Sequence, residues 1–131
     1  MRLLEAVLSL AVKGTIYVVD DDESVRDSAR ALLESYDLAV EDFASAKAFL
    51  ESFQTDQGGC LLLDVNMPEM NGLELLELLR DREIGIPVIF VTAENNAGVT
   101  ERAKRAGAFA LFEKPVDDSL IEAIGRALGD L

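Results

Sequence analysis

Residues 60–64 read Cys60-Leu61-Leu62-Leu63-Asp64, a run of four apolar residues that ends in a single carboxylate. The same pattern occurs three more times in the chain. Thr15-Ile16-Tyr17-Val18-Val19 precedes Asp20-Asp21-Asp22, Val88-Ile89-Phe90-Val91 precedes Thr92, and Phe109-Ala110-Leu111-Phe112-Glu113 precedes Lys114-Pro115. Short apolar runs of this kind predict buried β-strands. Ligands bind at the carboxyl ends of the strands in an open α/β sheet, so the four polar endings are expected to share one pocket.

Strand-like and helix-like segments alternate along the chain with a period of roughly 20–25 residues. The predicted strands are residues 15–19, 39–43, 60–63, 88–91 and 109–112. The predicted helices are residues 23–36, 46–53, 73–79, 95–106 and 119–128. Asp22 and Ser45 are expected to be N-caps, and Gly107 a C-cap. Continuous apolar strands joined by helices require a parallel sheet covered on both faces, so the sequence predicts an α/β, doubly wound fold.

Composition limits the classes of protein to which the chain can belong. Its 131 residues suit one domain. The net charge of −13, from 12 basic and 25 acidic residues, repels nucleic acid and anionic lipid and argues against direct binding to either. Cys60 is the single cysteine, which excludes an intramolecular disulfide and fits a cytoplasmic location. Histidine is absent, so imidazole catalysis is excluded and any phosphohistidine must belong to another protein.

Residues 1–13 are expected to be an N-terminal extension ahead of a domain that spans residues 14–131. Glu5 interrupts the apolar stretch and no small-residue cleavage site follows, which argues against a signal peptide. A stripe at helical spacing predicts a short helix that packs on its own domain or on a partner. The stripe consists of Leu3, Leu4, Val7, Leu8 and Ala11. An unusual start codon or vector-derived residues would explain the extension equally well, and the sequence leaves this open.

The expected pocket combines carboxylates, a hydroxyl and an ammonium: Asp20, Asp21, Asp64, Thr92 and Lys114. This set suits a divalent cation and a phosphoryl group on a carboxylate. Each feature also has a simpler explanation. Asp22 can cap the next helix, and the other polar residues can be ordinary turn or loop residues. One cap needs only one acid, however, and four coincidences at four strand ends make the simpler explanation the weaker one.

The run Asp64-Val65-Asn66-Met67-Pro68-Glu69-Met70-Asn71-Gly72 points to a family. Together with Asp20-Asp21-Asp22, Thr92-Ala93 and Lys114-Pro115, it closely resembles the receiver domain of two-component response regulators. The stretch Phe112-Glu113-Lys114-Pro115 is similar to the FixJ-like branch. The resemblance covers about residues 15–128. It implies a flavodoxin-like, five-stranded parallel sheet of order 2-1-3-4-5, with the active pocket at its carboxyl edge.

The resemblance also implies a role for each pocket residue. Asp64 is the expected phosphoacceptor and Asp21 the expected direct Mg²⁺ ligand, while Asp20 acts mainly through metal-bound water. Asn66 matches the position whose backbone carbonyl completes the protein's share of the coordination sphere. Carboxylates at close quarters repel one another, and a divalent cation removes that repulsion, so the chemistry agrees with a Mg²⁺ site.

The remaining roles concern the phosphoryl group and the loop after the phosphoacceptor. Lys114 is expected to pair with the phosphoryl oxygens, and Thr92 to donate its hydroxyl to them. Gly72 is expected to let the loop after Asp64 turn tightly, and Pro68 to stiffen it.

One position departs from the family's pattern. Many receivers carry Tyr or Phe three residues before the lysine as a switch coupled to the threonine, and this chain has Leu111 there. Strand alternation puts Phe112 on the opposite face, so Phe112 is not expected to substitute. The phosphoryl chemistry needs no aromatic residue at this position. The output of the switch is expected to use residues 95–106, the helix that looks least stable.

The sequence therefore predicts a signalling receiver that accepts a phosphoryl group from a sensor histidine kinase or phosphotransfer protein and changes a protein-binding face. Its catalysis is expected to be limited to its own phosphorylation and dephosphorylation. One alternative is a constitutive binding module. A weaker one is an aspartyl-phosphate phosphatase or phosphotransferase, which would need a second acid at Asn66. A DNA-binding output domain outside this chain, the oligomeric state and the cognate kinase are left open.

Overall fold

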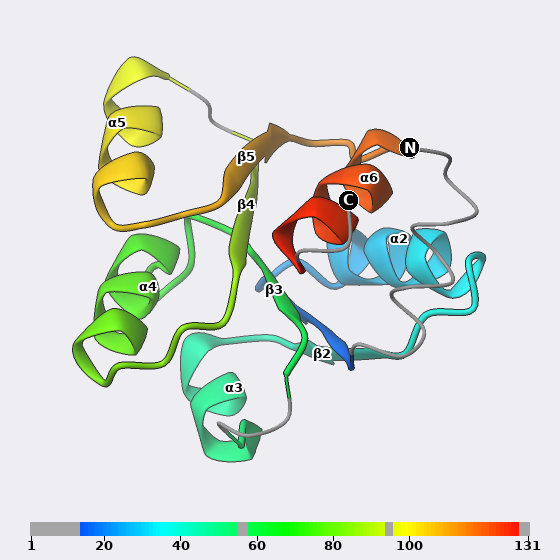
Figure 1. Ribbon diagram of the computed structural model, residues 1–131, viewed down its shortest axis with the longest axis horizontal. Coiled ribbons are helices and arrows are strands. Elements are labelled where there is room, and N and C mark those ends of the chain that lie inside the picture. The colour runs from blue at the N-terminus through cyan, green and yellow to red at the C-terminus, as the bar shows by residue number, and fades with distance from the viewer. Residues whose placement is uncertain (1–13, 55–57, 94–95, 129–131) are drawn as a thin grey trace.

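The fold is a five-stranded parallel sheet between two layers of helices (Figure 1). The computed structural model describes residues 14–54, 58–93 and 96–128. The strand order is β2-β1-β3-β4-β5, and every neighbouring pair is parallel. The strands are β1 (Ile16–Val19), β2 (Val40–Phe43), β3 (Cys60–Leu63), β4 (Val88–Thr92) and β5 (Ala110–Glu113). The doubly wound α/β fold of order 2-1-3-4-5 is therefore confirmed.

The helices follow the strands in strict alternation. They are α2 (Glu23–Glu34), α3 (Ala46–Ser52), α4 (Gly72–Asp81), α5 (Ala97–Arg105) and α6 (Ser119–Ala127). Polar side chains cap four of them by accepting a bond from a backbone N–H in the first turn. These caps are Asp22, Ser45, Asn71 and Asn96. The expected caps Asp22 and Ser45 are thus confirmed.

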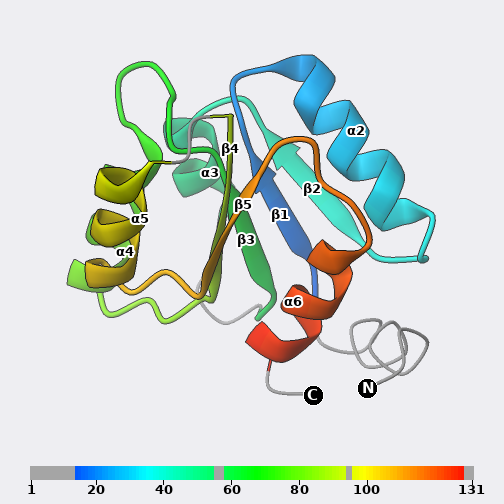
Figure 2. The ribbon, with the colours of Figure 1, turned by 90° about the horizontal axis from the view of Figure 1, so that it is seen from above.

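Two apolar cores lie on opposite faces of the sheet. Figure 2 shows α2 and α6 on one face and α3, α4 and α5 on the other. Successive residues of a strand point to opposite faces, so each central strand supplies both cores. Leu61 and Leu63 of β3 face the α3–α5 side, whereas Cys60 and Leu62 face the α2–α6 side. All four are almost completely buried, and burial of each leucine contributes roughly 1.5–3 kcal/mol.

The edge strand β5 shows the same alternation. Leu111 packs against the α3–α5 core and Phe112 against the α2–α6 core. The expectation that these two side chains lie on opposite faces is confirmed.

Several predicted boundaries were wrong by one or two residues. Helix α2 ends at Glu34, before the predicted Tyr36, because a turn follows in which Asp37 has a φ of 60°. The C-cap of α5 is Ala106, and the predicted cap Gly107 is the next residue, with a φ of 94°. Glycine adopts this left-handed conformation without strain and so suits the position just beyond a C-cap.

Residues 1–13 lie outside the described residues, as does Asn95 at the predicted start of α5. The expectation of an N-terminal extension therefore stays a prediction. Among the described residues, no helix combines the length and apolar character needed to span a bilayer.

Candidate functional site

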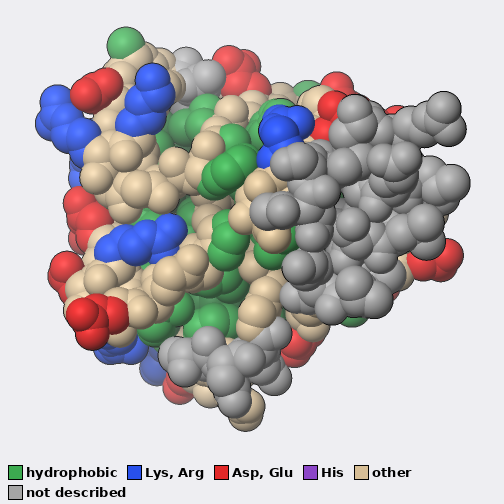
Figure 3. Space-filling view, in the orientation of Figure 1, with side chains coloured by type: hydrophobic (Ala, Val, Ile, Leu, Met, Phe, Trp, Pro, Cys, Tyr) green, Lys and Arg blue, Asp and Glu red, His purple; other side chains and the backbone are tan. Residues whose placement is uncertain are grey.

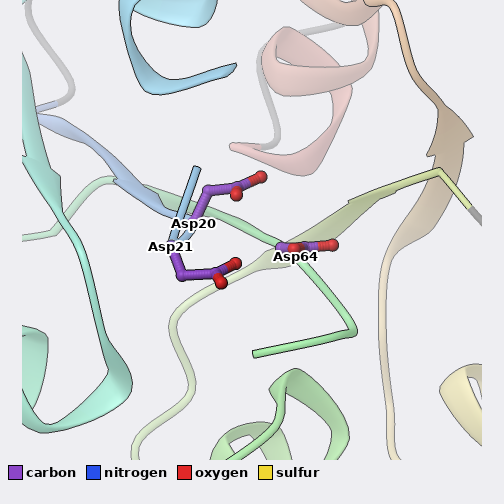
Figure 4. Close-up of side chains that lie close together, drawn as sticks. All are labelled: Asp20, Asp21 and Asp64. Atoms are coloured by element: carbon purple, nitrogen blue, oxygen red, sulfur yellow. The ribbon is translucent and has the colours of Figure 1, made fainter. Parts of the chain in front are cut away.

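Three carboxylates converge at the carboxyl edge of the sheet, where β1 and β3 end side by side. Val19 pairs with Leu63 in register, and the next residues are Asp20 and Asp64. The Asp64 N–H donates to the carbonyl of Val19 at 3.0 Å, which fixes the spacing of the two strand ends. Asp20, Asp21 and Asp64 each place a carboxylate oxygen within 4.8 Å of the others (Figure 4). This part of the predicted pocket is therefore assembled.

The three acids differ in their surroundings. Asp20 and Asp64 are buried, with 3% and 6% of their surface exposed, whereas Asp21 is exposed. One carboxylate oxygen of Asp20 accepts the N–H of Asp22 at 2.9 Å, and the other accepts the ammonium of Lys114 at 2.8 Å. Both carboxylate oxygens of Asp20 therefore already have protein partners. Among the described residues, the Asp21 carboxylate has no hydrogen bond or ion pair of this kind.

Lys114 brings the positive charge that faces these acids. Its Nζ lies 2.8 Å from Asp20 and 3.6 Å from Asp64. Burial lowers the pKa of the Lys114 ammonium, but its hydrogen bond to Asp20 and its attraction to Asp64 and Asp20 outweigh burial and raise the pKa overall. The lysine therefore stays charged in the pocket.

Thr92 enters the site region through the backbone. It is fully buried at the end of β4, opposite Glu113 in register, and its carbonyl accepts the N–H of Lys114 at 2.9 Å. The backbones of Thr92 and Lys114 therefore lie side by side at the same edge of the sheet.

The carboxyl group of Asp64 has a shifted pKa. Burial is the main cause and, with repulsion from Asp20, raises its pKa to about 6. Attraction to Lys114 and a hydrogen bond from the Asn66 N–H oppose the shift. The Asn66 side chain itself is exposed. A carboxylate that is costly to keep ionised is typical of a functional site.

A cavity of about 380 Å³ extends from the acids into the α2–α6 side of the molecule. Asp20, Asp64 and Lys114 line its polar end. Its apolar wall includes Val25, Ala29, Val116 and Leu120. The pocket is thus a cleft between α2 and the segment after β5, with Asp20, Asp64 and Lys114 at its polar end.

Sequence reasoning did not single out Arg26, which also touches the site. Its guanidinium donates to the backbone carbonyl of Asp20 at 2.8 Å and pairs with Asp42 of β2 at 3.4 Å. The available signal was a basic residue in the first turns of the helix after the acidic run. Its partner Asp42 lies on the strand β2, and this pairing can be seen only in the folded structure.

Comparisons with known proteins agree on one family. The family model of the response regulator receiver domain matches residues 16–125. The transcriptional regulatory protein TdiR of Thauera aromatica is 41% identical over 116 residues, covering 88% of this chain and 51% of that protein. The transcriptional regulatory protein FixJ of Azorhizobium caulinodans is 42% identical over 112 residues, covering 86% of this chain and 53% of that protein. The chain thus spans about half the length of these curated relatives.

Solved structures agree with this result. The crystal structure of FixJ-N superposes with a TM-score of 0.81 and 40% identity, covering 90% of this chain and 95% of that one. The low-resolution structure of the response regulator StyR gives a TM-score of 0.82 and 44% identity, covering 90% of this chain and 60% of that one. From its sequence match, its sheet order and the acids at its carboxyl edge, this chain belongs to the response regulator receiver domain family, in its FixJ-like branch.

Proposed function

We propose that Asp64 accepts a phosphoryl group from a phosphohistidine of a partner kinase or phosphotransfer protein. The observation that carries the proposal is a buried carboxylate at the end of β3 that lies 3.6 Å from the Lys114 ammonium and next to two further acids. The signalling role of the family supports it. These 131 residues contain no histidine, so a phosphohistidine donor lies outside them.

In the proposed step, an oxygen of the ionised Asp64 attacks phosphorus. A P–O bond forms, the P–N bond of the donor breaks, and its electron pair remains on the partner's imidazole. Lys114 pairs with the phosphoryl oxygens, and Thr92 donates its hydroxyl to them. Hydrolysis of the acyl phosphate by water restores the Asp64 carboxylate and releases phosphate.

A divalent cation fits the acidic cluster formed by Asp20, Asp21 and Asp64. The donors are all oxygen atoms, and the structure gives the exposed Asp21 carboxylate no hydrogen bond or ion pair within the described residues. Mg²⁺ prefers oxygen ligands and keeps several waters, so one or two carboxylates suffice to hold it. Asp21 and Asp64 would bind it directly, Asp20 through water, and Asn66 through its carbonyl. When bound, Mg²⁺ would neutralise negative charge on the phosphoryl group as it is transferred.

The relatives suggest what such a receiver controls. TdiR and FixJ are named transcriptional regulatory proteins and are about twice as long as the matched region. We therefore propose that the chain acts in two-component signalling in the cytoplasm and regulates an output domain that binds DNA. Phosphorylation would alter a protein-binding face.

The test is covalent labelling. Incubation with acetyl phosphate and Mg²⁺ should add one phosphoryl group to the intact protein, with the mass located on Asp64 and lost in base. Asp64→Asn should carry no adduct. Asp22→Asn is the matched control, because it changes an exposed acid of the same loop that caps α2, and it should be labelled like the parent. Absence of any adduct would contradict the proposal and favour a constitutive binding module, and an adduct that persists in Asp64→Asn would contradict the assignment of Asp64.

A further inference from the structure

Arg26 of α2 contacts the acidic loop, residues 20–22, which joins β1 to α2. One guanidinium nitrogen, Nη1, donates to the backbone carbonyl of Asp20 at 2.8 Å, and Nε lies 3.4 Å from the carboxylate of Asp42. The other carboxylate oxygen of Asp42 accepts a hydrogen bond from Arg30 at 2.9 Å. The Arg26 side chain is only 16% exposed. Helix α2, the edge strand β2 and the acidic loop are therefore joined through one guanidinium.

Every polar group of Asp20 is held by a partner. Its N–H donates to the carbonyl of Phe43 at 3.1 Å, and its carboxylate accepts from Asp22 and Lys114. Its carbonyl accepts from Arg26. The bonds of the Asp20 N–H and carboxylate fix the preceding peptide group and the side chain. The bond from Arg26 fixes the peptide group that follows.

That peptide group links Asp20 to Asp21. The Asp20 carbonyl and the Asp21 N–H lie in one rigid plane, so the carbonyl's direction determines where the Asp21 backbone starts. Within the described residues, the exposed Asp21 carboxylate has no hydrogen bond or ion pair of its own. The position of this carboxylate therefore depends on the backbone that Arg26 holds.

The pairing of Arg26 with Asp42 allows an arginine to hold this backbone beside the proposed cation site. An unpaired guanidinium would repel a bound cation, whereas the Asp42 carboxylate offsets its charge. Hydrogen bonding from Arg30 chiefly, with further attraction to Arg26, holds the pKa of Asp42 below its ordinary value. Asp42 therefore stays ionised, and Arg26 acts as a hydrogen-bond donor without an uncompensated charge.

We propose that Arg26, held by Asp42, is a positioning residue that sets the orientation of the Asp20–Asp21 peptide and thereby preorganises the acidic cluster for a divalent cation. The cation site itself rests on the proposed function. Groups that orient metal ligands from behind typically change metal affinity by 10–100-fold when they are removed.

The test compares Arg26→Gln with Arg30→Gln. Both changes remove an arginine of α2 that pairs with Asp42, but of the two only Arg26 donates a hydrogen bond to the Asp20 carbonyl. The hydrogen bonds of Arg30 go to Glu34 and Asp42. In metal-free protein, the amide NMR resonances of Asp21 and Asp22 should move in Arg26→Gln and stay in place in Arg30→Gln. In calorimetric titration with Mg²⁺, Arg26→Gln should bind about tenfold more weakly. Arg30→Gln should bind like the parent, although both variants should melt at lower temperature.

Arg26→Lys provides a second variant, since one ammonium can still donate to the Asp20 carbonyl and should restore part of the affinity. Equal weakening of Mg²⁺ binding in the two glutamine variants would reduce Arg26 to a structural residue and overturn the proposal. Unmoved Asp21 and Asp22 resonances in Arg26→Gln would also overturn it. If the parent and Asp21→Asn respond identically to Mg²⁺, the proposed metal site fails instead, and the metal-free resonances still decide the role of Arg26.

Discussion

At the scale of single residues, Asp64 is placed where its charge is unfavourable. It is buried next to Asp20, and Lys114 at 3.6 Å offsets only part of the cost, which leaves its pKa near 6. In the unfolded chain a carboxyl of this type titrates near pH 4. The folded protein therefore binds more protons than the unfolded chain between these two values. Its stability falls as the pH rises from about 4 to about 6 and stays reduced above that.

The first prediction follows from this loss of stability with rising pH. In metal-free buffer at pH 7, Asp64→Asn should be more stable than the parent by roughly 1–2 kcal/mol, because the amide has no charge to bury. The gain should shrink as the pH is lowered from about 6 and be lost below about pH 4, where the parent's carboxyl is protonated in both the folded and the unfolded state. Urea unfolding across this pH range measures it.

Asp22→Asn is the control for a general effect of removing negative charge. Hydrogen bonds from Ser24 hold the pKa of Asp22 below its ordinary value, so its ionised form is favoured in the folded state. This variant should show no gain at pH 7. Equal gains in both variants would mean that overall charge, rather than burial of Asp64, sets the pH dependence.

At the scale of secondary-structure elements, α4 begins directly against the backbone of Asp64. Gly72 is the first residue of α4, and an added Cβ would lie 2.1 Å from the Asp64 carbonyl oxygen. The structure therefore corrects the expected reason for this glycine. Its role is the close approach of two backbones, since it is not among the residues with a positive φ.

The second prediction is that Gly72→Ala destabilises the protein by more than about 2 kcal/mol, because the backbone atoms it meets cannot move aside cheaply. Gly85→Ala is the matched control. An added Cβ there meets nothing within 4 Å, and the change should stay within about 0.5 kcal/mol. Thermal unfolding of both variants tests this. Similar melting temperatures for the two would show that α4 can shift away from Asp64.

Helix α5 is the least anchored helix of the α3–α5 layer. It buries only Ala103, whereas α4 buries five residues. Elements with few buried contacts open most easily, and a ligand shifts the population of such states. Leu111 offers no aromatic ring that could swing toward Thr92, so the response is expected to pass through the α5 side of the sheet.

The third prediction concerns this response. Beryllofluoride, a mimic of the phosphoryl group, should change amide hydrogen exchange in residues 96–106 more than in β5. Asp64→Asn with beryllofluoride is the control and should show no change in either segment. A change confined to α6, or none outside the acidic pocket, would contradict this route.

Much of the fold could be predicted because buried parallel strands are continuous apolar runs, and the acids follow them directly. The helix ends were less predictable. The φ of 60° at Asp37 and the cap at Ala106 depend on local turn geometry that the pattern of apolar residues does not encode. The pairing of Arg26 with Asp42 joins a helix to an edge strand, and such a contact appears only when the chain is folded.

At the scale of the whole molecule, the charge is strongly negative but unevenly distributed. Figure 3 shows most of the lysine and arginine side chains in view on one side, over α4 and α5, with acidic side chains among them. Arg80 and Arg102 contribute to this side, but Glu77 and Asp81 line the same shallow groove. Arg80 is also engaged with the carbonyls of the chain segment that follows α4. The local positive charge is thus interrupted by acids.

The fourth prediction is that this chain by itself does not bind duplex DNA at physiological salt, because its net charge of −13 repels phosphates. Fluorescence anisotropy with a labelled duplex should give no dissociation constant tighter than about 10⁻⁴ M, the weak end of non-specific binding. If binding does appear and Arg102→Glu abolishes it, the basic side is a nucleic-acid surface and the prediction is wrong.

The burial of Cys60 has a practical consequence for experiments on this protein. The chain's single thiol is completely enclosed by the α2–α6 core, and burial raises its pKa to about 12. A thiol with these properties resists alkylation and oxidation, since the thiolate is the reactive form. A cysteine introduced on the surface would therefore be the one reactive thiol. A spin label or fluorophore on α5 could report its movement without removal of the native residue.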